Sequence, residues 1–116
     1  MVERPISLKG GNAMPKLVKV AEAQEVAPGT GKVVGAEGRS IALFNVAGAS
    51  HAIDNACTHQ GGPLGEGDLS GEVVTCPWHG AQFNVKTGDV LAPPARTGVR
   101  SFPVQVQRDD VLVELD

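Results

Sequence analysis

The chain has 116 residues, a length that suits one domain, because half of it would barely form a hydrophobic core. Hydrophobic residues make up 41% and charged residues 20%, which is ordinary for a folded protein and argues against disorder. The formal net charge of −3 gives no reason to expect nucleic-acid binding, which calls for a basic surface.

No stretch of the sequence approaches the roughly 18 apolar residues that a membrane span requires. The segment Met1–Gly11 is polar and of mixed charge, without the apolar core of a signal peptide. We therefore expect a cytoplasmic protein that does not insert into a membrane.

Turn formers are abundant, with 15 Gly and 8 Pro, and they separate short segments that read as strands. Residues 1–13 lack any alternating pattern and are expected to be a flexible N-terminal extension to a domain over residues 14–116. The expected strands are Leu17–Val20, Lys32–Gly35, Arg39–Val46, Ser50–Asp54, Glu72–Thr75, Ala81–Val85, Val99–Gln107 and Val111–Leu115. One helical turn is expected near Ala21–Val26, and a Pro-rich loop over Ala92–Gly98. The sequence thus predicts an all-β domain of short antiparallel strands.

Both cysteines and two of the three histidines fall in two short motifs, Cys57-Thr58-His59 and Cys76-Pro77-Trp78-His79. Sixteen residues separate the first motif from the second, and Gly and Pro follow or interrupt each. In a reducing compartment, two cysteines are more often metal ligands or free thiols than a disulfide. Two loops that each carry a thiol and an imidazole can close over a metal from opposite sides.

The segments C-T-H-Q-G-G-P-L-G at 57–65 and C-P-W-H-G at 76–80 resemble the two cluster-binding boxes of the Rieske family. The resemblance implies a Rieske-type antiparallel β-sandwich with a cluster-binding subdomain made of two loops, about residues 55–66 and 75–84. It implies one [2Fe–2S] cluster, with Cys57 and Cys76 as thiolate ligands of one iron. His59 and His79 would bind the other iron through ring nitrogens near the surface.

Residues beside these four are also expected to contact the cluster. Cluster sulfides are negatively charged and need N–H donors, and glycine lets backbone amides approach closely because it has no Cβ. Proline fixes φ directly after a ligand, and a tryptophan between two ligands is expected to shield the cluster from water. The cofactor-contacting residues expected on these grounds are Gln60, Gly61, Pro77, Trp78 and Gly80.

The chain departs from the Rieske proteins of quinol-oxidising complexes, which carry a further cysteine in each box and join the loops by a disulfide. Gly62 and Trp78 stand at those places here. Those proteins also donate hydroxyl hydrogen bonds to the cluster from a Ser and a Tyr, where this chain has Ala81 and Phe83. Fewer donors stabilise the reduced cluster less, so we expect a potential near the low end of the roughly −150 to +300 mV Rieske range.

In length and in its lack of extra cysteines, the chain is similar to the ferredoxins of multicomponent ring-hydroxylating or related oxygenases. That similarity implies an electron carrier, not an enzyme, acting as a monomer between an NAD(P)H-dependent flavoprotein reductase and a terminal oxygenase. One alternative is the Rieske-like small subunit of an assimilatory nitrite reductase. A second is a zinc-stabilised interaction module, because two Cys and two His also form a zinc ligand set. Zinc fingers usually keep their cysteines together and their histidines together, whereas each motif here holds one of each.

Three further features have simpler expectations. His51 is expected to be an exposed strand residue without a redox role. The acidic residues Glu66, Asp68 and Glu72 are expected to form a solvated turn, with electrostatic docking of a partner as the alternative. The loop at Pro93-Pro94 is expected, by family resemblance alone, to pack against the cluster loops as a third wall.

Overall fold

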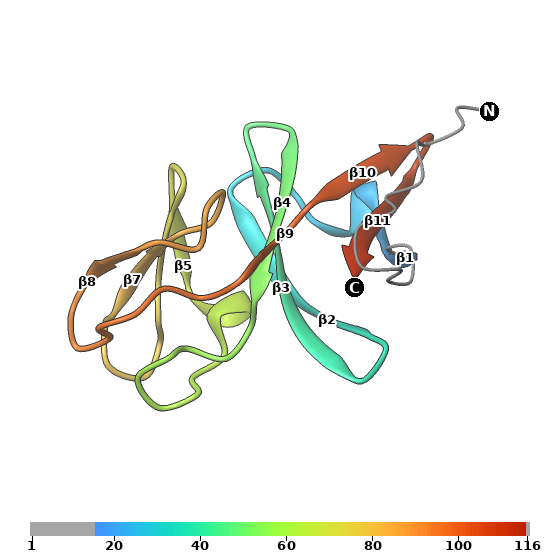
Figure 1. Ribbon diagram of the computed structural model, residues 1–116. Helices are drawn as coiled ribbons and strands as arrows, with labels where there is room; N and C mark the ends of the chain where they lie inside the picture. Colours follow the sequence, from blue (N-terminus) through green and yellow to red (C-terminus); the bar gives the residue numbers. More distant parts are fainter. Residues whose placement is uncertain (1–15, 116) are drawn as a thin grey trace.

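The computed structural model describes residues 16–115, which fold into short antiparallel strands and two 3₁₀ turns, Ala23–Glu25 and Leu64–Glu66 (Figure 1). The expected extension of residues 1–13 lies outside the described residues. The strands are β1 (Lys16–Glu22), β2 (Thr30–Ala36), β3 (Arg39–Val46), β4 (Ala49–Asp54), β5 (Asp68–Ser70), β6 (Val73–Thr75), β7 (Gln82–Asn84), β8 (Val90–Ala92), β9 (Ser101–Phe102), β10 (Val104–Gln107) and β11 (Asp110–Leu115). The predicted all-β fold is confirmed.

The strands form three antiparallel sheets, in the orders β1-β11-β10, β2-β3-β4-β9 and β5-β6-β7-β8. The sheet that contains β2, β3 and β4 lies between the other two (Figure 1). One hydrophobic cluster joins this central sheet to the β1-β11-β10 sheet, and a second joins it to the β5–β8 sheet. The central sheet is therefore covered on both faces.

Strand β3 shows how one short sequence serves both clusters. Ile41 and Leu43 belong to the first cluster, whereas Ala42 and Phe44 belong to the second. Successive side chains of a strand point to opposite faces, so a run of four apolar residues can fill two cores at once. All four side chains are at most 1% exposed. This strand ties the half of the domain that contains the β5–β8 sheet to the half that contains the β1-β11-β10 sheet.

The structure corrects the predicted elements at three places. The predicted strand Val99–Gln107 is broken at Pro103, and its two parts, β9 and β10, belong to different sheets. Strands β5 and β8 were not predicted, because three residues are too few to show an alternating pattern. Strand β5 lies where a solvated acidic turn was expected, and β8 reaches into the expected Pro-rich loop.

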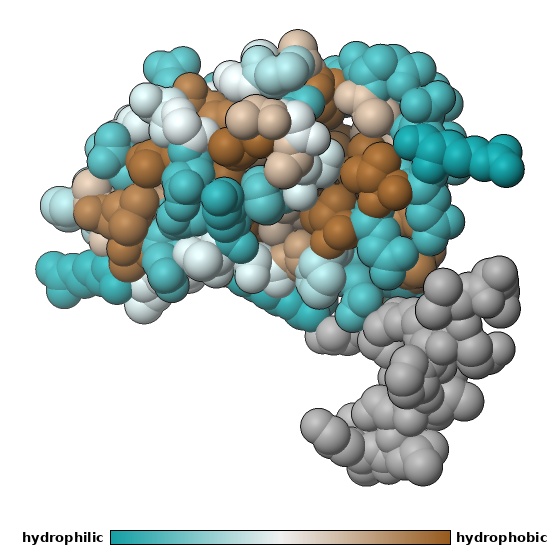
Figure 2. Space-filling view, turned by 90° about the horizontal axis from the view of Figure 1, so that it is seen from above, coloured by the Kyte–Doolittle hydropathy of each residue, from teal (hydrophilic) through white to brown (hydrophobic). Residues whose placement is uncertain are grey.

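The surface of the described residues mixes apolar and polar side chains. Large hydrophobic residues are exposed at Trp78, Leu91 and Val106. On the face shown in Figure 2, apolar patches are interrupted by polar side chains. Among residues 16–115, no helix has the length and hydropathy needed to cross a membrane.

His51 in β4 is only partly exposed, which corrects the expectation of a simple surface residue. Its Nε2 is buried and has no hydrogen-bond partner. Burial lowers the pKa of the imidazole, and the positive charge of Lys86 lowers it further, while Glu72 acts in the opposite direction. Protonation of His51 is therefore unfavourable in the folded protein.

The stability of the protein is expected to depend on pH through His51. As the pH falls, His51 of the unfolded chain binds a proton near its ordinary pKa of 6.5. In the folded protein it binds the proton only at a lower pH. The free energy of unfolding should therefore be highest above pH 6.5 and should fall as the pH decreases toward the lower folded pKa. Thermal unfolding midpoints of the wild type and of His51→Gln should be measured between pH 5 and 8. The difference between the two midpoints should change only below about pH 6.5. Parallel curves would contradict the assignment.

Candidate metal centre

The two predicted motifs lie in loops that have the same backbone hydrogen bonds. In the first, the N–H of Cys57 donates to Gly62 O (2.9 Å), and the N–H of Gly61 donates to Cys57 O (2.7 Å). In the second, the N–H of Cys76 donates to Ala81 O (2.7 Å), and the N–H of Gly80 donates to Cys76 O (3.1 Å). Each cysteine thus begins a tight loop that closes over the following five residues.

The glycine four residues after each cysteine has a positive φ, 78° at Gly61 and 82° at Gly80. Residues with a Cβ rarely adopt this conformation, so glycine is needed at both places for the loops to close. The loops follow β4 in one case and connect β6 to β7 in the other. The sequence predicted contacts of both glycines with a cofactor, and the structure gives each a conformational role as well.

The thiols of Cys57 and Cys76 meet between the two loops. Both residues are 3% exposed and belong to the same hydrophobic cluster. Burial raises the pKa of the Cys57 thiol, and the neighbouring Cys76 raises it further. The backbone N–H groups of His59 and Gln60 act in the opposite direction and lower this pKa. Amides directed at this sulfur are the donors that a bound thiolate requires.

The imidazoles of His59 and His79 meet on the exposed side of the same loops. Their ring centroids are 5.0 Å apart and their planes are inclined by 85°. A metal–nitrogen bond of about 2.1 Å places a ring centroid roughly 3 Å from the metal, so two imidazoles on one ion lie roughly 5 Å apart. The two rings are therefore spaced as a pair of ligands to one metal would be. Gln60 Oε1 lies 2.7 Å from His79 Nε2.

Each loop thus contributes one thiol to a buried pair and one imidazole to an exposed pair. Within residues 16–115, no three or more His, Cys, Asp or Glu side chains gather in a way that could hold a single metal ion. A Rieske cluster does not need such a group, because two protein ligands on each iron are completed by sulfides. The donor types and their pairing fit a two-iron cluster.

The comparison with known families agrees with this geometry. The family model of the Rieske [2Fe–2S] domain matches residues 16–103. The chain belongs to the Rieske [2Fe–2S] family. Its cofactor is accordingly a Rieske-type [2Fe–2S] cluster.

Several known proteins are similar to this Rieske chain. The biphenyl dioxygenase ferredoxin subunit of Pseudomonas sp. (strain KKS102) is 37% identical over 97 residues, which are 83% of this chain and 89% of that protein. The solved complex of reduced oxygenase and oxidized ferredoxin in carbazole 1,9a-dioxygenase contains a chain with a TM-score of 0.79 and 36% identity, covering 84% of this chain and 91% of that one.

A third similarity bears on the nitrite reductase alternative. A Mycobacterium tuberculosis protein described as an NADH-dependent nitrite reductase small subunit has a TM-score of 0.79 at 23% identity. That similarity covers 90% of this chain and 98% of the other. At such low identity, it shows the shared fold alone.

Gly62 and Trp78 face each other between the two Rieske loops. A Cβ added to Gly62 would lie 2.7 Å from Cys76 Sγ and 3.0 Å from Trp78 Cγ. By the family resemblance, these are the two positions at which the Rieske proteins of quinol-oxidising complexes have their further cysteines. Trp78 is 55% exposed, so its ring covers the junction between the loops from outside. In this chain, the loops are in contact at these positions through Gly62 and the indole ring of Trp78, without a covalent bond.

Gly62→Ala is expected to reduce the cluster content substantially, because the new methyl group would push Cys76 or Trp78 out of place. Gly62 does not have a positive φ, so backbone strain is not part of the effect. Gly35→Ala is the matched control, since its new Cβ would come no closer than 3.9 Å to another atom, Arg39 O. Iron and acid-labile sulfide per chain should fall in the first variant and not in the second. Equal, full occupancy in both would contradict the packing argument.

The segment after Pro93-Pro94 packs against the cluster loops, while a third wall formed by the two prolines themselves stays an expectation. Ala95 is buried in the same hydrophobic cluster as Cys57 and Cys76. The hydroxyl of Thr58 donates to Thr97 O (2.7 Å). No local pattern in the sequence predicts this bond, which joins residues 39 positions apart. Ala81 and Phe83 are also fully buried in this cluster, and neither has a hydroxyl group.

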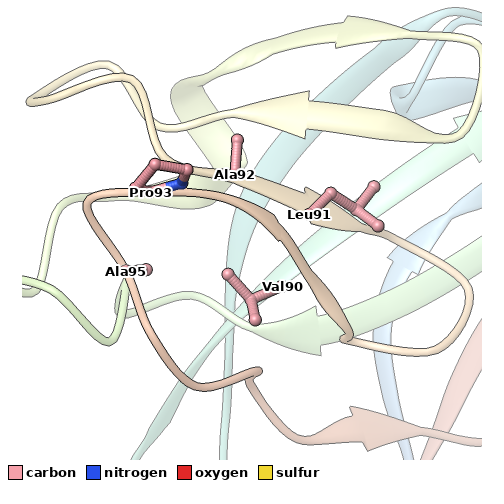
Figure 3. A pocket seen from close by; sticks show the side chains of 5 residues that line it. All are labelled: Val90, Leu91, Ala92, Pro93 and Ala95. Carbon is pink, nitrogen blue, oxygen red and sulfur yellow. The ribbon is translucent and has the colours of Figure 1, made fainter.

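A shallow hollow of about 240 Å³ lies along the same segment (Figure 3). Its lining consists of Val90, Leu91, Ala92, Pro93 and Ala95. None of these five side chains can act as an acid, a base or a nucleophile. The hollow therefore has none of the groups that a catalytic pocket needs.

The three acidic residues near the site have different environments. Glu72 accepts a hydrogen bond from Asn84 Nδ2 (2.8 Å) and pairs with Lys86 (3.5 Å). The hydrogen bond from Asn84, and next the charge of Lys86, lower the pKa of Glu72. Glu66 and Asp68 are exposed. Glu72 is thus fixed by its neighbours, and the other two carboxylates remain exposed at the surface.

Proposed function

We propose that this protein is the ferredoxin of a multicomponent ring-hydroxylating or related oxygenase system. The [2Fe–2S] cluster, when bound, supplies reversible one-electron chemistry at the surface of a Rieske domain over residues 14–116. The single observation that carries the proposal is that the thiols of both motifs are buried whereas the imidazoles of both motifs are exposed. An electron carrier needs one side of its redox centre close to solvent, where a partner can approach.

In this proposal, Cys57 and Cys76 hold the inner iron and His59 and His79 hold the outer iron. The backbone amides at Cys57 stabilise the thiolate, and the positive-φ glycines keep the loops closed. Gln60, Gly61, Pro77, Trp78 and Gly80 form the surroundings of the cluster. Four protein ligands leave neither iron a free position for a substrate, so the chain transfers electrons and is not itself an enzyme.

The proposed partners are an NAD(P)H-dependent flavoprotein reductase and a terminal oxygenase. The similar proteins of the biphenyl and carbazole systems are named as ferredoxins, and one of them is seen in complex with an oxygenase. His59, His79 and Trp78 are exposed together at the tips of the cluster loops, and this surface is where both partners would dock in turn. A monomer in the cytoplasm suits such alternation, and cysteines in a reducing compartment serve as metal ligands more often than they form a disulfide.

Electron transfer between purified components tests this function. The protein, as isolated with its cluster, should be reduced by the flavoprotein of an aromatic-ring oxygenase system and reoxidised by the terminal oxygenase in stopped-flow experiments. Stable co-purification with a nitrite reductase large subunit, without reoxidation by an oxygenase, would favour the nitrite reductase alternative. A colourless protein that holds zinc and no labile sulfide would favour the interaction module.

A further inference from the structure

The side chain of Gln60 connects the two cluster loops through an imidazole. Its Oε1 lies 2.7 Å from His79 Nε2, across 19 residues of sequence. An amide oxygen can only accept a hydrogen bond, so Nε2 is the nitrogen that carries the proton. In a neutral imidazole the other nitrogen, Nδ1, then has the free lone pair. The hydrogen bond thus selects Nδ1 as the nitrogen that can bind a metal.

His59 has a different environment from His79. The His59 ring contacts the His79 ring. Within the described part of the chain, the nitrogens of the His59 ring make no hydrogen bond. Both rings are exposed, so solvent can reach the outer side of each. The two imidazoles are therefore inequivalent, although the loops that carry them have the same backbone hydrogen bonds.

We propose that Gln60 is a positioning residue for His79, which orients the ring, selects its iron-binding nitrogen and lowers the reduction potential of the cluster. The inference rests on the proposed role of His79 as an iron ligand. Metal-bound histidines commonly donate their second N–H to an acceptor, which makes the ring a stronger electron donor. A stronger donor stabilises the oxidised iron more than the reduced iron, and so disfavours uptake of an electron.

The same bond leaves His59 as the imidazole with an outer nitrogen free to bond with a partner protein. Gln60 occupies the corresponding nitrogen of His79. An acceptor group on a docking partner would therefore bond to His59 without displacing an internal hydrogen bond. The alternative is that Gln60 is simply a solvated loop residue or a direct partner contact, with no effect on the isolated protein.

Reduction potentials of cluster-loaded variants test the proposal at one fixed pH and without any partner. Gln60→Leu removes the acceptor, and Gln60→Asn moves it away from His79 because the side chain is shorter. Neither changes the net charge, and both should raise the reduction potential. Loss of one hydrogen bond should change the reduced-to-oxidised ratio at the wild-type midpoint about fivefold. Gln60→Glu, a stronger acceptor, should lower the potential. Pulsed electron paramagnetic resonance should show altered coupling of one ligand nitrogen and not of the other.

The matched control is Gln107→Leu, a similar change at an exposed glutamine of β10, which should leave the potential unchanged. Should Gln60→Leu fail to hold its cluster, Gln60→Asn, with the smaller change in side chain, provides the same measurement. Intact clusters with wild-type potentials in both neutral variants would overturn the role of Gln60 and leave the proposed function standing. A wild-type protein without labile sulfide would overturn the ligand assignment itself, and this inference with it.

Discussion

Cys76→Ala should abolish the [2Fe–2S] cluster, with iron and acid-labile sulfide falling from about one cluster per chain to nearly none. Cys76 is 3% exposed and adjoins Cys57 between the loops, so no other side chain or water can easily take its place. An iron left with one thiolate would lose much of its binding free energy. The loss should be visible in the absorption spectrum of the anaerobically purified variant.

Val74→Ala is the control for general damage to the same hydrophobic cluster. Val74 is fully buried beside Cys76, and its truncation should lower the free energy of unfolding by about 1–3 kcal/mol. It should nevertheless keep the labile sulfide, because it supplies no ligand. A Cys76→Ala protein with a full complement of labile sulfide would contradict the assignment of this thiol, whatever its stability.

His79→Cys should keep a cluster but lower its reduction potential substantially, toward the roughly −400 mV of clusters ligated by cysteine alone. Two ferric ions, two sulfides and two thiolates carry no net charge with neutral imidazoles, whereas a third thiolate makes the oxidised cluster an anion. Adding an electron to an anion is less favourable than adding it to a neutral cluster.

The same variant should also show a weaker dependence of its potential on pH. An electron on the cluster favours protonation of the outer imidazole nitrogens, and only one imidazole would remain. Redox titrations over a range of pH measure both effects. His51→Gln serves as the control, because His51 is the one histidine outside the two motifs and lies in β4, and its loss should not move the potential. A His79→Cys titration that matches the wild type would show that His79 is not a ligand.

Much of the fold could be predicted because its longer strands have strong local signals. Strands β3 and β11 each combine apolar or β-branched residues with a preceding turn, and they lie within one residue of their predicted limits. The helical turn expected near Ala21–Val26 is the 3₁₀ turn Ala23–Glu25. By contrast, β5 and β8 have three residues each, and they are strands only because neighbouring strands supply their hydrogen-bond partners.

The composition of the candidate site is set by the sequence, because ligand identity, glycine spacing and the missing loop cysteines are local properties of two short motifs. The Rieske resemblance implied that thiol pairs with thiol and imidazole with imidazole, and the tertiary structure brings the members of each pair together. That pairing depends on how the β5–β8 sheet presents the second loop to the first, which no local pattern encodes. The bond from His79 to Gln60 has the same origin, since it joins side chains from different loops. Likewise, Ala95 is buried and both faces of β3 are covered only because strands far apart in the sequence pack together.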